Sequence, residues 1–373
     1  VERVEILDSL NVVFHLNHSS GGFLYSLASP FSLMISTRTV SESGNKNDTI
    51  YYGTGPFIKD NFSGPVYSIK KNKQYQGIKS ELDRVYFVRL LDNENREYSL
   101  TKGEVDILSN ISGHQIDRLK WLGKIDYYVQ RPFDIFFLGF NNKNKEMKNI
   151  FLRKAIASAI DLKKLVFNVN RGNAVVAMGP LPEIYYNYEG SIQLEYNLNE
   201  SKKYLLNSGL GKSVNLNIII PKMALTRETL LETIKTQLSK IGISLNVIYS
   251  YNWDEHDKLV KDPKSHLFID GARSEIIGDP EPFLYSLFSS NSVFNTMNYN
   301  SPDVDSLLLM LKKEGDANQR FILCNQIMKH IENDVPALFL YHVKSHYAYN
   351  KEKIKKMVVN PYGLIQYHKV QLN

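Results

Sequence analysis

The chain has 373 residues, of which 43% are apolar and 23% charged, and its formal net charge is +6. This composition predicts a folded globular protein of roughly two to three domains and excludes a disordered chain. No run of about 18 apolar residues occurs, so no membrane-spanning segment is expected. The positive charges are spread along the chain, without the clustered basic patch that is typical of nucleic-acid-binding proteins.

The first half of the chain is expected to consist mainly of strands and tight bends. Strand patterns cover residues 10–16, 66–69 and 85–90. The glycine-rich stretch GTGPF at 53–57 lacks the Gly-Lys-Ser/Thr ending and the following helix of a phosphate loop. It therefore predicts a structural turn.

Residues 132–161 are predicted to form a strand, a bend and a helix in succession. The apolar run 133–140 predicts a strand that is buried on both faces. Asn149 can cap a helix with a 3.6-residue apolar period, and Asp161 can cap a second short helix. We expect this unit to mark the place where the chain leaves one lobe and enters another.

The second half is more regular. Residues 214–220 alternate as a strand, Thr226 can cap the next helix, and residues 243–249 alternate again. Strand, helix and strand at this spacing predict a βαβ unit with parallel strands. Further helices are expected at 254–261, 303–312 and 317–333, the second of them with Ser301 as its cap and Pro302 at its first position. Further strands are expected at 267–270, 338–341 and 346–349.

No motif supports catalysis or a metal centre. His342 and His346 are four residues apart but fall in strands, where this spacing does not bring two imidazoles together to bind zinc. The cluster 254–257 (DEHD) is interpreted as a solvated helix turn. The only cysteine, Cys324, falls on an apolar helix face, and no G-x-S-x-G elbow occurs. The sequence thus predicts no enzyme, no cofactor and no metal.

The most unusual stretch is IDGARSEIIGDPEP at 269–282. It follows a predicted strand and places four charged residues among glycines and prolines: Arg273, Glu275, Asp279 and Glu281. Loops at the carboxyl ends of parallel strands are where α/β sheets bind ligands. A solvated loop explains the same composition, so the residues alone leave both interpretations open.

Short stretches in a fixed order extend over nearly the whole chain. They include YGTGPF at 52–57, KGEVDIL at 102–108, FLGFNN at 137–142, LRKAIASAID at 152–161, GDPEPFLYSLF at 278–288 and VPALFLY at 335–341. Together they resemble family 5 of the bacterial extracellular solute-binding proteins, the dipeptide, oligopeptide and nickel group of ABC importers.

The resemblance implies an α/β fold, a two-lobed clamshell of the type II periplasmic-binding kind with mixed sheets, which lacks the N-terminal part of lobe one. It implies two crossings between lobes, near residues 136–141 and 340–349. The implied domains are 1–50 (the end of an extra subdomain and the return to lobe one), 51–135 (lobe one), 136–344 (lobe two) and 345–373 (return to lobe one).

The resemblance also implies a ligand site. Peptide-binding members carry an Asp in a G-W-x-A-D loop, which pairs with the α-ammonium of the peptide. Here the loop reads GARSE at 271–275, so Glu275 takes the Asp position and Ala272 replaces the Trp. A carboxylate is a suitable partner for a buried ammonium. The implied ligand-binding residues are Arg273, Ser274, Glu275, Phe140 and Asn141.

The implied function is that of the substrate-binding component of an ABC importer, which captures a peptide or similar small solute and delivers it to a membrane permease. We expect a periplasmic or extracytoplasmic monomer, free or anchored through an N-terminal segment absent from this chain, with no nucleic-acid partner. Two alternatives stay open: a metal-chelate-binding protein of the nickel branch, and the ligand-sensing domain of a transcriptional regulator.

Overall fold

A computed structural model describes most of the chain. The described residues are 1–37, 53–61, 64, 66–90, 93–109, 111, 113–130, 133–182, 185, 193–222, 227–273 and 278–373. They fall into two compact units, which are considered separately: the larger combines Val1–Ser29 with Phe133–Val343, and the smaller combines Pro30–Pro132 with Lys344–Asn373. No helix in the described ranges has both the length and the apolar character that a membrane crossing requires.

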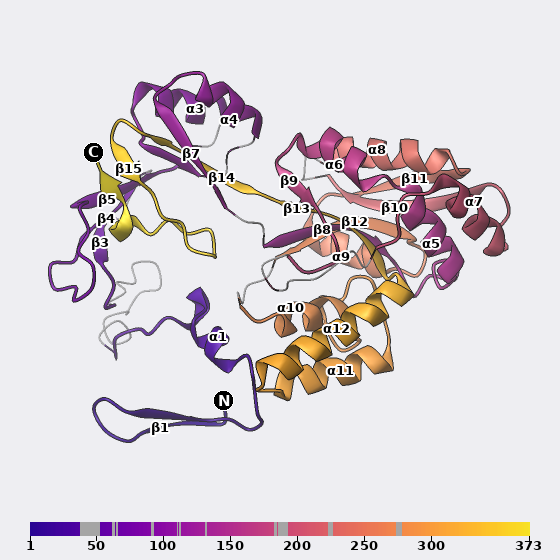
Figure 1. The fold of residues 1–373 in the computed structure, drawn as a ribbon, viewed down its shortest axis with the longest axis horizontal. Coiled ribbons are helices and arrows are strands. Elements are labelled where there is room, and N and C mark those ends of the chain that lie inside the picture. The colour runs from indigo at the N-terminus through magenta and orange to yellow at the C-terminus, as the bar shows by residue number, and fades with distance from the viewer. Residues whose placement is uncertain are drawn as a thin grey trace. The chain divides into compact units, whose positions relative to one another are not determined.

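The larger unit is built on a six-stranded mixed sheet in the order β11-β10-β12-β8-β13-β9 (Figure 1). Its strands are β8 (Asp134–Phe140), β9 (Ala174–Val176), β10 (Val214–Pro221), β11 (Ile243–Ser250), β12 (Leu267–Arg273) and β13 (Ala337–Val343). β10 runs parallel to β11 and β12, and β8 runs antiparallel to both β12 and β13. The carboxyl ends of β10, β11, β12 and β13 therefore meet at one edge of the sheet.

The predicted βαβ unit is confirmed. β10 and β11 pair in parallel from Val214↔Ile243 to Pro221↔Ser250, and α8 (Arg227–Ser239) connects them. Gly242, just before β11, has φ +85°, a conformation that glycine adopts without a Cβ penalty. The predicted cap of α8, Thr226, lies outside the described residues.

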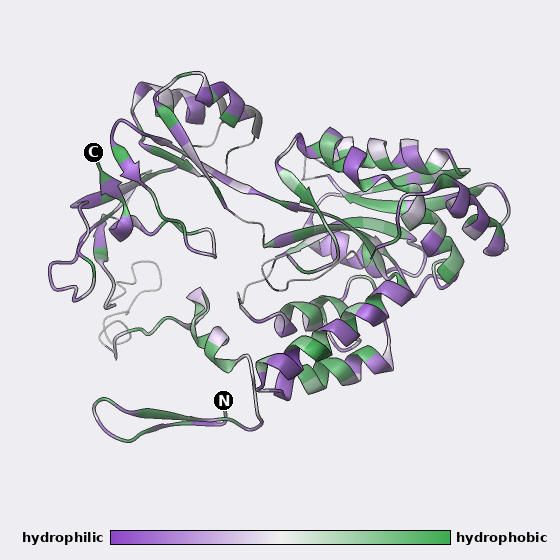
Figure 2. Cartoon of the chain, viewed as in Figure 1, coloured by the Kyte–Doolittle hydropathy of each residue, from purple (hydrophilic) through white to green (hydrophobic). Residues whose placement is uncertain are grey.

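Helices cover both faces of the sheet. One face packs on α5 (Ile150–Ala159), α6 (Leu162–Asn170), α7 (Leu198–Asn207) and α8, and the other on α9 (Trp253–Lys261), α10 (Glu281–Phe288), α11 (Pro302–Lys313) and α12 (Ala317–Asp334). Phe137 belongs to one core and Phe140 to the other, which confirms that β8 is buried on both faces. Figure 2 shows the strands of this sheet largely in green, as its burial requires.

The predicted helix caps are confirmed where the structure describes them. The Asn149 side chain accepts from the Phe151 amide, and Asp161 caps α6 in the same way. Ser301 caps α11, with Pro302 as the first helical residue. Cys324 is buried on the apolar face of α12, also as predicted.

The N-terminal residues form an antiparallel hairpin, β1 (Arg3–Ile6) and β2 (Val12–His15), followed by α1 (Phe23–Leu27) and the short 3₁₀ helix Pro30–Ser32. The sequence prediction assigns residues 1–50 to a subdomain and the return to lobe one. In the structure Val1–Ser29 belong to the larger unit, and the Ser19 hydroxyl donates to the Lys313 carbonyl at 2.6 Å. The assignment of residues 1–50 to a subdomain stays a prediction.

In the part of the smaller unit that the structure describes, the strands form three small antiparallel sheets. They are β3 (Phe57–Asn61), β4 (Val66–Lys71) and β5 (Arg84–Val88); β6 (Ile107–Ser109), β14 (Ser345–Asn350) and β7 (Ile125–Gln130); and β15 (Ile354–Lys356) with β16 (Gln371–Leu372). Two helices, α3 (Asn93–Lys102) and α4 (Gly113–Lys120), and the 3₁₀ helix Tyr367–Lys369 complete it. β14, from the end of the chain, lies between β6 and β7.

The chain changes unit at three places, after residues 29, 132 and 343. The crossing expected near 136–141 therefore falls inside the larger unit, as part of β8. The remaining lobe assignments stay predictions.

Candidate functional site

A cavity of about 700 Å³ lies at the carboxyl end of β12, and the larger unit alone forms it. β12 contributes residues 270–273, α9 contributes its N-terminal part and β8 contributes Phe137. The rest of the lining comes from α10 and from residues 291–294 and 296. The carboxyl ends of parallel strands are the usual ligand-binding edge of an α/β sheet. This position makes the cavity the candidate ligand site.

Aromatic and apolar side chains form much of the cavity wall while remaining exposed. Trp253 keeps 56% of its surface exposed, Phe294 68% and Val293 73%. Below them, Phe283 and Leu287 of α10 are buried. Large apolar side chains gathered around a hollow typically mark a binding surface, because covering them removes apolar area from water.

His256 also lines the cavity, and its position corrects one prediction. The interpretation of residues 254–257 as a solvated helix turn is wrong for this histidine, which is only 1% exposed. Its Nδ1 lies 2.9 Å from the Ser250 hydroxyl, and its ring meets that of Trp253 edge to face. The signal was present in the sequence, because His256 and Val260 are four residues apart and therefore share the buried face of α9.

Charged groups stand at the same edge of the sheet. Arg273, the last residue of β12, lines the cavity and pairs in register with Asp134 on β8. Burial raises the pKa of Asp134, while the Val343 amide and the positive charge of Arg273 act in the opposite direction. Asp270 lines the cavity and accepts a hydrogen bond from the Gly271 amide. The edge thus offers a guanidinium and a carboxylate to a ligand.

The structure divides the residues predicted to bind ligand. Arg273 lies at the cavity. Ser274 and Glu275 follow it directly in the sequence but lie outside the described residues. Their roles remain predictions.

Phe140 and Asn141 lie at the opposite end of β8. Phe140 pairs with Leu267, whereas Arg273 pairs with Asp134, and the six intervening residue steps correspond to roughly 20 Å. Phe140 is fully buried in the core. The structure does not bring these two residues to the cavity.

Asn141 has a structural environment of its own. Its side-chain amide donates to the Asp262 carbonyl at 2.7 Å and to the Ser265 hydroxyl at 2.8 Å. Its side-chain oxygen accepts from Asn298 at 3.0 Å and from the Lys143 amide. All hydrogen-bonding atoms of this amide are therefore used inside the fold.

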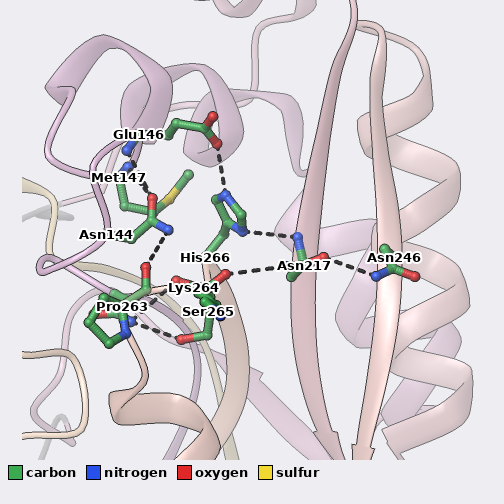
Figure 3. A network of polar contacts seen from close by, with 10 residues as sticks. Asn144, Glu146, Met147, Asn217, Asn246, Pro263, Lys264, Ser265 and His266 are labelled. Carbon is green, nitrogen blue, oxygen red and sulfur yellow. Dashed lines mark hydrogen bonds and ion pairs between the residues drawn. The ribbon is translucent and has the colours of Figure 1, made fainter.

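A polar network continues along that edge of the sheet (Figure 3). His266 Nε2 lies 2.7 Å from Glu146, and His266 Nδ1 accepts from the Asn217 amide at 3.1 Å. Because Nδ1 accepts, the ring proton belongs on Nε2, where it is donated to Glu146. Asn246 donates to the Asn217 side chain, and Asn144 donates to the Pro263 carbonyl. These bonds hold the bend after β8 against the start of β12.

The two histidines that were considered as zinc ligands, His342 and His346, are buried in strands of different units. His342 is buried in β13, with its Nδ1 at 2.5 Å from the Asp134 carbonyl, and His346 is buried in β14 of the other unit. Within the described ranges, no three His, Cys, Asp or Glu side chains are grouped so as to hold a metal ion.

A second cavity, of about 900 Å³, lies within the smaller unit among β5, β6 and the C-terminal residues. The strands paired there are antiparallel. The argument from the carboxyl ends of parallel strands therefore does not apply to it.

Comparisons with known proteins place the chain among transport proteins. The family model "Bacterial extracellular solute-binding proteins, family 5 Middle" matches residues 1–295. The dipeptide-binding protein of Escherichia coli K12 is 24% identical over 388 residues, covering 100% of this chain and 72% of that protein.

Solved structures agree in fold. HbpA2 from Haemophilus parasuis superposes with a TM-score of 0.89 at 24% identity, covering 100% of this chain and 75% of that one. The dipeptide-binding protein from Pseudoalteromonas sp. SM9913, in complex with Met-Leu, gives 0.80 at 21% identity, with 100% and 76% covered. The α/β fold expected from the sequence is confirmed by these superpositions.

Proposed function

The chain belongs to family 5 of the bacterial extracellular solute-binding proteins, and from this premise we propose that it is the substrate-binding component of an ABC importer. In this role it captures a peptide or a similar small solute and hands it to a membrane permease. Support for a peptide comes from two similar proteins: one is a dipeptide-binding protein by name, and the other was solved with Met-Leu.

The cavity at the carboxyl end of β12 is the observation that carries this proposal. Trp253 and Phe294 offer aromatic surfaces to a ligand side chain. Covering one apolar side chain against them contributes roughly 2 kcal/mol. Such contacts depend on area and shape, so they suit a binder that accepts several related peptides.

The charges at this edge suit the two ends of a peptide. A peptide is a zwitterion, and each of its charges needs a partner once water is displaced. Arg273 is our candidate for binding a carboxylate, because it lines the cavity. Glu275 is our candidate for the α-ammonium, by its place two residues later in the sequence.

Binding and release are the whole of the proposed activity. The family consists of solute-binding proteins, and we propose that this chain catalyses no reaction. The family's description as extracellular supports a site of action outside the cytoplasm. We further propose that the protein works as a monomer, either free or attached to the membrane.

Native mass spectrometry of the purified protein, followed by denaturing release of what is bound, tests this function. A ladder of short peptides supports the proposal and gives their length range. A metal chelate would instead move the protein to the nickel branch of the family. If the protein is empty and isothermal titration detects no binding of a library of di- to hexapeptides, the peptide proposal is overturned.

A further inference from the structure

Part of the cavity wall is a short segment that follows α10, residues 289–296, which we call the wall segment. Its two large apolar side chains, Val293 and Phe294, line the cavity and are 73% and 68% exposed. They belong to no helix or strand. Apolar side chains on a backbone that is free to move turn inward, because burial removes apolar area from water. Their exposure therefore requires a backbone that is held in place.

Asn295 holds this backbone from the inside. It is 6% exposed and, unlike residues 291–294 and 296, does not line the cavity. Its side-chain amide donates to the Ser289 carbonyl at 3.0 Å and to the Tyr299 carbonyl at 2.7 Å, and its Oδ1 accepts from the Tyr299 amide at 3.1 Å. One buried side chain thus bonds to the first residue of the wall segment and to a residue beyond its end.

Tyr299, to which Asn295 bonds, is itself firmly placed. It is 5% exposed, and its hydroxyl donates to Asp334, the last residue of α12, at 2.5 Å. Its ring packs edge to face on Phe288 of α10. The bonds of Asn295 therefore connect the wall segment to a framework that includes both α10 and α12.

A second hydrogen bond reaches the wall segment from α9. Lys261, the last residue of this helix, donates from its Nζ to the Val293 carbonyl at 3.0 Å. Trp253, the first residue of the same helix, forms another part of the cavity wall. Because α9 carries one aromatic wall and bonds to the segment that carries the other, it limits how far the two walls can separate.

We propose that Asn295 and Lys261 are positioning residues, which hold Val293 and Phe294 in water as a preformed surface for a large apolar side chain of the ligand. This inference rests on the proposed function and narrows the substrate class to peptides or similar solutes with an aromatic or branched aliphatic residue. A surface that is already ordered loses little conformational freedom on binding. More of the free energy of apolar burial then appears as affinity.

Asn295→Ala is the stronger of two test variants. It leaves the Ser289 and Tyr299 carbonyls without their donor, so it should lower stability as well as release the wall segment. Asn300→Ala is its matched control. Asn300 is exposed, lies next to Tyr299 in the sequence and does not line the cavity.

Lys261→Met tests the same inference without a risk to the fold. It keeps the apolar stem and removes the donor to the Val293 carbonyl. The ion pair lost with it, to Asp257 at 4.0 Å, is solvent-exposed, and such pairs contribute little to stability. Lys258→Met is the control on the same helix, because Lys258 is exposed and does not line the cavity.

Two measurements are made on each variant well below its unfolding temperature. The first is hydrogen exchange of the amides of residues 294–296, which are hydrogen-bonded inside the wall segment. The second is the affinity for Ala-Phe and for Ala-Gly by isothermal titration.

Asn295→Ala should speed exchange, weaken Ala-Phe roughly tenfold and weaken Ala-Gly less than twofold, because only the phenyl ring covers the wall segment. Lys261→Met should act in the same direction, with about a threefold loss for Ala-Phe. Both controls should match the wild type. A general loss of structure would weaken the two dipeptides equally, so the ratio of the two losses separates positioning from stability.

Three outcomes overturn the inference and leave the proposed function standing. They are equal losses for the two dipeptides in both variants, faster exchange with unchanged affinity for Ala-Phe, and a wild-type protein that binds Ala-Gly as tightly as Ala-Phe. Loss of Ala-Phe affinity in Asn300→Ala or Lys258→Met would also contradict it.

N-acetylphenylalanine amide separates the inference from the function, because it has the apolar side chain and neither charged end of a peptide. If the wild-type protein binds this probe but no peptide, the peptide function fails. Weaker binding of the probe by Asn295→Ala then still supports the inference, and unchanged binding overturns it. A wild-type protein that binds neither the probe nor any peptide overturns both.

Discussion

At one edge of the six-stranded sheet, Asn141 is completely buried and every hydrogen-bonding atom of its amide is used. At the other edge, Trp253 is more than half exposed beside a cavity. The same strands thus end in paired, buried polar groups on one side and in exposed aromatic surface on the other. A buried polar group costs free energy unless it is paired, so the first edge serves stability. The second leaves apolar surface in water, which a ligand can cover.

Residues at the two ends of one strand are therefore not equally good candidates for a binding site. Asp134 and Asn141 flank the two ends of β8, but only the first end reaches the ligand-binding edge. If stability and binding are separated in this way, substitutions at one end of the sheet should change stability and spare affinity, and those at the other end should do the reverse.

Asn141→Ala should destabilise the protein, because it removes the buried amide at the end of the sheet opposite the cavity. The change leaves the Asn298 amide and the Ser265 hydroxyl without their partner and opens a small cavity, so we expect a loss of about 3 kcal/mol in the free energy of unfolding. Urea denaturation followed by circular dichroism measures it. Affinity for Ala-Phe should stay within twofold of the wild type; a large loss of affinity with normal stability would place Asn141 at the ligand.

Glu281 should make stability depend on pH. Burial, and then the charge of Asp279, raise its pKa to about 7, while Lys312 and Arg320 act in the opposite direction. The folded protein keeps this proton up to about pH 7, whereas the unfolded chain loses it near 4.5. The contribution of Glu281 is therefore fully present below about pH 4.5 and is lost as the pH rises through 7, by roughly 2–3 kcal/mol.

Glu281→Gln should remove most of this dependence. The free energy of unfolding, measured in urea at pH 5 and pH 8, should fall less with rising pH in the variant than in the wild type. Equal slopes in the two proteins would show that another group titrates.

Glu275→Gln should weaken the binding of peptides that have a free α-ammonium. If Glu275 pairs with the α-ammonium, its loss weakens a free-amine dipeptide by about 2 kcal/mol, or roughly 30-fold, and spares the N-acetylated form. Isothermal titration with Ala-Phe and acetyl-Ala-Phe gives both numbers. Equal losses for the two ligands would remove Glu275 from the ammonium role.

Trp253→Ala should have the smallest effect on the fold. Since the indole is half-exposed, we expect less than about 1 kcal/mol of lost stability. Affinity for Ala-Phe should fall roughly tenfold, and affinity for Ala-Gly should fall less, because glycine has no side chain to cover the aromatic wall. Isothermal titration gives the ratio of the affinity lost for Ala-Phe to the affinity lost for Ala-Gly, which shows whether the indole contacts the ligand side chain. Equal losses would mean that the indole does not contact the ligand side chain.

Much of the fold could be predicted because its signals are local. The caps Asn149, Asp161 and Ser301 bond to amides two or three residues away. The alternation in β10 and β11 and the helix between them determine a parallel pair. The family was also recognisable, because ordered short stretches record packing needs along the whole chain.

The site could be predicted only in part. Arg273 was chosen because it comes just after a predicted strand, and it lines the cavity, whereas its contact with a ligand stays a prediction. Phe140 and Asn141 were chosen for their nearness to a crossing, and antiparallel pairing with β12 carries them to the other end of the sheet. His256 was missed because its acidic neighbours were interpreted as a solvated turn, although its spacing from Val260 places it on the buried face of α9.

Local patterns in the sequence thus specified many of the helices and strands, the caps Asn149, Asp161 and Ser301, the parallel βαβ unit and the family, since each depends on neighbours in the chain or on a pattern of residue types. Only the tertiary structure decided which residues share an edge of the sheet. It placed Trp253 and Phe294 around one cavity and Gly22 against Asp279. Contacts between residues that are tens to hundreds of positions apart follow from strand order and direction, and no local pattern specifies them.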